Sequence, residues 1–85
     1  MQTVPLIVPD LGTSDRQKIV VSSWLVGQGD DVVQGDRIVE LLLDEVTFDV
    51  CSPATGRLVE ILLDIDDTVK AGSVLGNISQ TDGED

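Results

Sequence analysis

The two halves of this 85-residue sequence repeat one another when they are offset by 37 positions. The matched positions are Trp24-Leu25 with Ile61-Leu62, Asp30-Asp31-Val32 with Asp67-Thr68-Val69, Gly35 with Gly72, Ile38 with Leu75, and Leu41 with Ile78. Chance agreement in a Val- and Leu-rich chain is the alternative, but the glycine match argues against it, since glycine marks a special backbone conformation. The repeat predicts two similar four-strand halves, related by a pseudo-twofold axis, with their apolar faces packed together.

Short apolar segments bounded by turn residues run through the chain, and none has a helical period. The expected strands are Val4–Val8, Ile19–Val26, one on each side of Asp44-Glu45, Arg57–Leu63 and Val74–Ile78. Aliphatic side chains must fill the core, with Trp24 capping it, because Trp24 and Phe48 are the only aromatic residues. We predict an all-β domain over residues 1–79, a flattened barrel or sandwich of two four-stranded antiparallel sheets. Residues 80–85 are expected to form a flexible acidic tail or the start of a linker.

The stretch Leu41–Val50 predicts a β-hairpin. An apolar run leads in, Asp44-Glu45 interrupts it, and Val46, Phe48 and Val50 then alternate with polar residues. The turn holds neither glycine nor asparagine, so we expect a type I turn with both central residues at negative φ. Its tip should present the Glu45 side chain to water.

The charge of the chain is strongly acidic, with 16 acidic and five basic residues and a net charge of −11. Nucleic acid and anionic membranes are poor partners for such a surface. Solubility is one interpretation of the charge, and electrostatic steering toward a basic enzyme surface is the other. No segment has the length of a membrane span, and the first residues do not resemble a signal peptide.

Little in the sequence favours chemistry of its own. The acidic cluster Asp64, Asp66 and Asp67 lacks the glycine and glutamate spacing of a calcium loop. The chain has no histidine and a single cysteine, Cys51, so neither a zinc site nor a nucleophile–base pair can be assembled. We interpret Cys51 as a core or strand-end residue compatible with a reducing cytosol. An independent enzyme is not expected.

In order and spacing, the chain resembles the lipoyl/biotinyl carrier domains, especially the lipoyl domains of the acyltransferase component of 2-oxo acid dehydrogenase complexes. The segments that carry this resemblance are Val8-Pro9-Asp10-Leu11-Gly12, Trp24-Leu25-Val26, Gly29-Asp30, Gly35-Asp36, Ile38-Val39-Glu40, Pro53-Ala54-Thr55-Gly56 and Asp67-Thr68-Val69-Lys70-Ala71-Gly72. The family fold is a flattened β-barrel of two four-stranded sheets, which agrees with the internal repeat.

The resemblance implies that the hairpin turn is the place where this family attaches lipoate, as an amide of a lysine in an Asp-Lys-Ala triplet. Here the triplet is Asp44-Glu45-Val46, and Glu45 stands at the lysine position. A carboxylate cannot form the lipoyl amide, so no cofactor is expected for the chain as written. Lys18 and Lys70 are the only lysines, and both are interpreted as solvated charges rather than substitutes.

The resemblance also implies partners and a recognition surface. The partners are the decarboxylase and dihydrolipoamide dehydrogenase components, and a lipoate ligase for lysine-bearing members, in the cytoplasm or a mitochondrial matrix. The residues expected to take part in recognition are Asp10, Leu11, Gly12, Thr13, Glu40 and Asp49. Three alternatives remain: a carrier domain with its lysine replaced, a non-lipoylated binding or assembly module, and a biotinyl carrier. The biotinyl reading is disfavoured because that family has methionine on both sides of the lysine.

Overall fold

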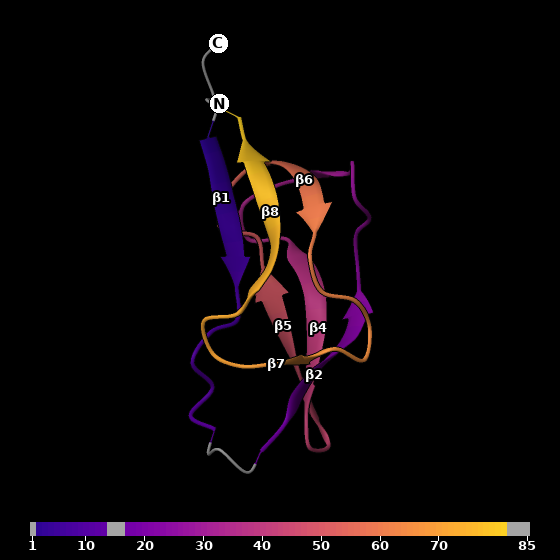
Figure 1. Cartoon of the computed structure of the whole chain (residues 1–85). Coiled ribbons are helices and arrows are strands. Elements are labelled where there is room, and N and C mark those ends of the chain that lie inside the picture. The colour runs from indigo at the N-terminus through magenta and orange to yellow at the C-terminus, as the bar shows by residue number, and fades with distance from the viewer. Residues whose placement is uncertain (1, 14–16, 82–85) are drawn as a thin grey trace.

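The computed structural model describes residues 2–13 and 17–81, and every helix or strand element in these ranges is a strand. The strands are β1 (Gln2–Ile7), β2 (Ile19–Trp24), β3 (Asp31–Val32), β4 (Arg37–Leu43), β5 (Val46–Cys51), β6 (Gly56–Ile61), β7 (Thr68–Val69) and β8 (Val74–Gln80). They form two antiparallel sheets, with strand orders β1-β8-β6-β3 and β5-β4-β2-β7. Figure 1 shows how the longer strands run along the length of the molecule. The predicted fold class is confirmed.

The core lies between the two sheets and consists of aliphatic side chains. The buried apolar residues are Leu6, Val8, Ile19, Val21, Val32, Ile38, Val39, Leu41, Leu43, Val50, Ala54, Leu58, Val69, Leu75 and Ile78. Strand β4 supplies the largest number of them, and its residues Val39, Leu41 and Leu43 share one face because every second residue of a strand points to the same side. Trp24 is partly buried against this cluster, and its Nε1–H donates a hydrogen bond to the Leu63 carbonyl at 2.8 Å. The predicted capping position of Trp24 therefore holds.

The internal repeat is visible in both the strands and their hydrogen bonds. Strands β2, β3 and β4 begin and end 37 residues before β6, β7 and β8. The amide of Leu25 donates to the carbonyl of Ile38 at 2.8 Å, and the amide of Leu62 donates to that of Leu75 at 2.9 Å. The bulge in the β2–β4 ladder recurs, at the same offset, in the β6–β8 ladder. Offset by 37, the two halves therefore share one backbone design.

Some strand bounds differ from the predicted ones. The first strand begins at Gln2 and ends at Ile7, and it forms an edge of its sheet, where Pro5 is tolerated. The last strand continues through Gln80, because its register with β1 pairs Gln80 with Gln2. The predicted acidic tail lies, from residue 82, outside the described residues. Residues 14 and 15, in the segment between β1 and β2, also lie outside the described residues.

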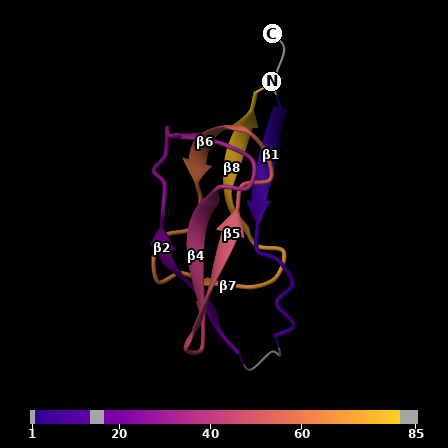
Figure 2. The ribbon, with the colours of Figure 1, turned by 180° about the vertical axis from the view of Figure 1, so that it is seen from behind.

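The hairpin formed by β4 and β5 lies at one end of the molecule, and the start of β1 and the end of β8 lie at the other. Figures 1 and 2 show this separation from opposite sides. The described residues on either side of positions 14–16 lie toward the same end as the hairpin. Any recognition surface at the hairpin tip is therefore far from the residues where the fold begins and ends.

We expect Gly35→Val and Gly72→Val to destabilise the fold to a similar extent. The φ angles of these residues are +94° and +89°, and a β-branched side chain is strained in that region although no atom lies within 4 Å of an added Cβ. The expected loss is about 1–3 kcal/mol each, measured by chemical denaturation. Gly27→Ala is the control, since Gly27 lacks a positive φ and its added Cβ would meet Asp30 at an ordinary 3.5 Å. Full tolerance of either valine variant would contradict the equivalence of the two turns.

Candidate functional site

The candidate site is the tip of the β4–β5 hairpin. Leu43 pairs with Val46 in the β4–β5 ladder, so Asp44 and Glu45 form a two-residue loop. Both residues are exposed, and so is Val46, with 55% of its surface accessible. The strands below the tip are held by the buried Leu41 and Leu43. The hairpin therefore presents a short acidic tip on a rigid base, as the sequence predicted.

The turn type differs from the predicted one. Asp44 has a φ angle of +55°, so the expectation of negative φ at both central residues is wrong. A two-residue hairpin loop favours a positive φ at its first central residue, because that geometry matches the right-handed twist of the strands. Aspartate tolerates the left-handed region better than most residues. The twist of the flanking strands therefore sets the turn geometry, although the turn contains no glycine.

One hydrogen bond connects the turn to the segment before β2. The Gln17 side-chain amide donates from Nε2 to Oδ2 of Asp44 at 3.1 Å. Gln17 lies 27 residues before Asp44 in the chain, so this contact depends on the fold rather than on local sequence. It fixes the Asp44 carboxylate beside the β1–β2 connection and leaves the neighbouring Glu45 to face solvent.

The loop residues expected to take part in recognition, Asp10 to Thr13, form a compact turn. The Gly12 amide donates to Oδ1 of Asp10 at 2.9 Å, and Gly12 has a φ of +72°. Asp10 and Gly12 are exposed, whereas Leu11 is partly buried and packs against the core. Asp10 and Thr13 line a hollow that Gln17 also lines. This loop therefore adjoins the hairpin tip through Gln17.

The other two expected recognition residues lie on the hairpin itself. Glu40 and Asp49 are direct partners across the β4–β5 ladder. Asp49 also accepts a hydrogen bond from Arg37 Nη1 at 3.5 Å, in an exposed ion pair of small energetic value. In the described ranges no hydrogen bond or ion pair joins Glu40 or Asp49 to residues 10–13. Glu40 and Asp49 therefore belong to the hairpin strands, whereas Asp10 to Thr13 belong to the connection after β1.

The arrangement at the tip suits presentation rather than catalysis. Asp44 and Glu45 are exposed, and catalytic acid–base pairs need burial or close charged neighbours to tune them. Within residues 2–13 and 17–81, no three acidic or cysteine side chains are grouped as a metal site would require. Cys51 ends β5, as predicted, and is exposed rather than in the core. Lys18 and Lys70 are not part of the two-residue tip, and both line the hollow beside the β1–β2 connection.

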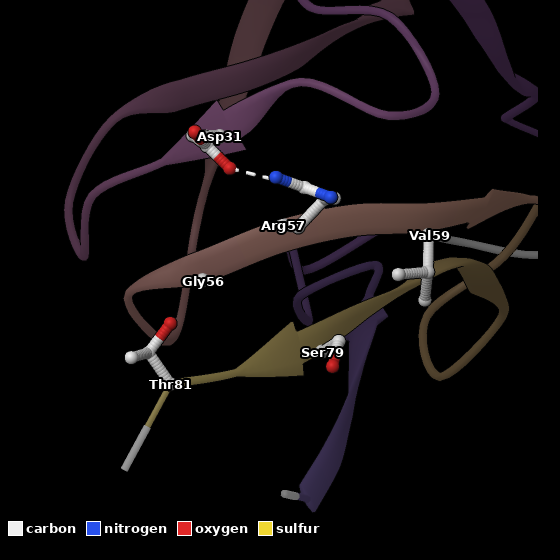
Figure 3. A pocket seen from close by; sticks show the side chains of 6 residues that line it. All are labelled: Asp31, Gly56, Arg57, Val59, Ser79 and Thr81. Carbon is white, nitrogen blue, oxygen red and sulfur yellow. Dashed lines mark hydrogen bonds and ion pairs between the residues drawn. The ribbon is translucent and has the colours of Figure 1, made fainter. Parts of the chain in front are cut away.

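A second hollow lies on the sheet opposite the hairpin, over β3, β6 and β8. It has a volume of about 320 Å³, and Figure 3 shows the ion pair between Asp31 and Arg57 across it. Their Oδ1 and Nε atoms are 3.1 Å apart, with both side chains more than half exposed. An exposed pair of this kind contributes little. This hollow adds no chemistry to the candidate site.

Sequence reasoning missed two features of this region. The first is Gln17, whose contact with Asp44 has no local signal. The second is the shared hollow of Lys18 and Lys70, which arises because β2 pairs with β7 in the register Ile19 to Val69. The 37-residue offset was the available signal, since it equates β7 with β3. It did not by itself reveal which strand β7 pairs with.

Comparison with known proteins identifies relatives along almost the whole chain. Residues 4–78 match the biotin/lipoyl family model, described as "Biotin-requiring enzyme". The chain is similar to the dihydrolipoyllysine-residue succinyltransferase component of the 2-oxoglutarate dehydrogenase complex from Bacillus subtilis, with 38% identity over 77 residues. That match covers 91% of this chain and 18% of the relative. The dihydrolipoyllysine-residue acetyltransferase component of the pyruvate dehydrogenase complex from Corynebacterium glutamicum is 38% identical over 71 residues, or 84% of this chain and 10% of the relative.

A solved structure shows the same fold. It is the lipoyl domain of the 2-oxoglutarate dehydrogenase complex from Azotobacter vinelandii, with a TM-score of 0.69 and 25% identity. The match covers 88% of this chain and 96% of that domain. The chain thus spans one whole domain of this kind but less than a fifth of the curated relatives above. In the described ranges no helix is both long and apolar enough to cross a membrane.

We expect Glu45→Lys to change the free energy of unfolding by no more than about 0.5 kcal/mol, because the residue is exposed. Asp44→Val should cost about 1–2 kcal/mol, since a β-branched residue would have to adopt the positive φ of Asp44. Urea denaturation of both variants measures the difference. A loss of several kcal/mol in Glu45→Lys would show that the tip is not in solvent.

Proposed function

The chain belongs to the biotin/lipoyl carrier-domain family, and on this basis we propose that it is a lipoyl-type carrier domain of a 2-oxo acid dehydrogenase acyltransferase that is not lipoylated as written. Domains of this kind are carrier modules rather than catalytic domains. The observation that carries the proposal is the exposed two-residue turn, in which Glu45 stands where the resemblance places the lysine.

The chemistry of the turn supports this proposal. Attachment of lipoate as an amide needs an amine nucleophile on a long, flexible stem, and Glu45 offers a carboxylate instead. Neither lysine of the chain substitutes for it, since Lys18 immediately precedes β2 and Lys70 immediately follows β7. The carrier framework is otherwise complete, with both sheets and the hairpin in place.

The partners follow from the same proposal. The decarboxylase and dihydrolipoamide dehydrogenase components of such a complex would meet the hairpin end, where Asp10 to Thr13 and the Glu40–Asp49 pair are presented. A net charge of −11 favours approach to a basic enzyme surface. A lipoate ligase would recognise the same turn once a lysine is restored.

A second candidate function is a docking or assembly module that never carries lipoate. The hydrogen bond from Gln17 to Asp44 favours this candidate, because it orders the turn without any attached group. Such a module would bind the decarboxylase component through the unmodified hairpin end. The two candidates differ in whether a restored lysine is sufficient for modification.

Lipoylation of a restored lysine tests the proposal. The chain, its Glu45→Lys variant and a Gln34→Lys control are incubated with lipoate, ATP and a lipoate ligase, and their intact masses are measured. Gln34 is exposed in a turn near the other sheet, so this control supplies a lysine off the hairpin. We expect only Glu45→Lys to gain one lipoyl group.

The other outcomes discriminate clearly. Modification of the unaltered chain would show that Lys18 or Lys70 carries the arm and would overturn the assignment of Glu45. If no variant reacts, the ligase does not recognise this hairpin, and the docking module becomes the better account. Binding of the unaltered chain to a decarboxylase component, weakened by a Glu40→Ala and Asp49→Ala double variant, would then support that account.

A further inference from the structure

The two pseudo-equivalent turns of the molecule differ in one hydrogen bond. In the first half, the backbone amide of Gln34 donates to Oγ1 of Thr55 at 3.0 Å. At the offset of 37 residues, Ala71 replaces Gln34 and Lys18 replaces Thr55. A lysine ammonium has donors and no acceptor, so it cannot accept the equivalent bond. Within the described part of the chain, the Ala71 amide has no acceptor.

The replacement of Thr55 by Lys18 in the second turn also places two like charges side by side. Strand β2 pairs with β7 through Ile19 and Val69, both of which are buried. One step beyond this pair come Lys18 and Lys70, which therefore share the outer face of the sheet. In the equivalent β3–β6 ladder, the positions next to the Val32–Gly56 pair are Val33 and Thr55, which are uncharged. Like charges on facing positions repel and destabilise a sheet unless a counter-charge lies between them.

In the described ranges no carboxylate forms an ion pair with Lys18 or Lys70. Arg37 and Arg57 are paired with Asp49 and Asp31, whereas neither lysine ammonium is within ion-pair distance of a described carboxylate. This is unusual in a chain whose acidic residues outnumber its basic ones by more than three to one. Among the described basic residues, the two that form no ion pair line the same hollow.

Both lysines line one hollow with a volume of about 480 Å³, which also has Ala71 in its wall. The hydroxyl-bearing Thr13 and Thr68 line it too, and both can donate hydrogen bonds. Asp10 is the one carboxylate among its described lining residues, and its Oδ1 accepts the Gly12 amide of its own turn. The hollow is therefore rich in donors and has room for a small molecule.

We propose that this hollow binds the oxyanion of a small molecule, a carboxylate or a phosphate. One oxygen accepts the Ala71 amide in the place that Thr55 Oγ1 fills in the other half, and the anion lies between the ammoniums of Lys18 and Lys70. The charge-assisted bonds relieve the repulsion between the lysines. This site is independent of any group attached at the hairpin, although Gln17 belongs to its wall and contacts Asp44.

Amide chemical shifts of the ¹⁵N-labelled whole chain test the proposal. Succinate and inorganic phosphate are titrated separately at constant ionic strength, with chloride as the balancing anion. We expect the Ala71 amide to shift saturably with at least one of them. Whichever saturates at the lower concentration identifies the source of the oxyanion, and saturation by either supports the site.

Three variants make the test specific. Lys18→Thr copies the residue of the first half, so it should weaken binding at least tenfold and slow hydrogen exchange of the Ala71 amide. Lys18→Gln removes the charge alone and should weaken binding less than Lys18→Thr. Arg37→Gln removes one positive charge from a distant strand and should change the affinity by less than twofold.

Several results would overturn the proposal. Shifts that rise linearly with both anions would indicate general ionic effects, and unchanged binding by Lys18→Thr would remove Lys18 and Ala71 from the site. Equal losses in Lys18→Gln and Arg37→Gln would show that only net charge matters. Because Lys18 and Arg37 are exposed, all three variants are expected to fold, which the dispersion of their spectra verifies.

Discussion

Exchange of strands between the two halves is the constraint on which the rest of the structure depends. Strand β3 of the first half pairs with β6 of the second, and β7 of the second pairs with β2 of the first. In the described ranges, only the β2–β4 and β6–β8 ladders join strands of the same half. A two-residue strand such as β3 or β7 cannot persist alone, so each half satisfies the backbone of the other. The same exchange brings Lys70 to Lys18. The β2–β4 ladder, within the first half, brings the segment before β2 to the hairpin turn.

The sequence predicted those features that depend on alternation and on the 37-residue repeat. The hairpin, the aliphatic core and the two equivalent glycine turns were all accessible, because each leaves a periodic or glycine signal in a short window. The conformation of Asp44 was not, since it depends on the twist of the strands that the turn connects. The contact of Gln17 with Asp44 depends on the pairing of β2 with β4, and the hollow beside it depends on the pairing of β2 with β7. The bounds of β3 and β7 were also missed, because two residues are too few to show a period.

The repeat gives two copies of one backbone design on which different chemistry can be compared. In the first copy the turn after β3 is closed by Thr55, and in the second the turn after β7 opens onto two lysines. The hairpin tip beside that second turn carries Asp44 and Glu45, so opposite charges are concentrated at one end of the molecule. A strongly acidic chain thereby keeps its two lysines where the acidic hairpin and the β1–β2 connection meet. The closeness of the two lysines to the acidic hairpin tip follows from how the strands pair and not from the amino-acid composition.

The register between β1 and β8 brings the first and last strands together, so the chain could start at a different strand without changing the pairing of the strands. Gln2 faces Gln80 in that ladder just as Val46 faces Leu43 at the hairpin, and the 37-residue offset relates Gln80 to Leu43. A two-residue connection from Gln80 to Gln2 would therefore build a second hairpin, and cutting between Asp44 and Glu45 would create new chain ends there. The resulting circular permutant would have the same two sheets and the same core. Folding information in this domain lies in the pairing of its strands, and the point at which the polypeptide starts is a separate choice.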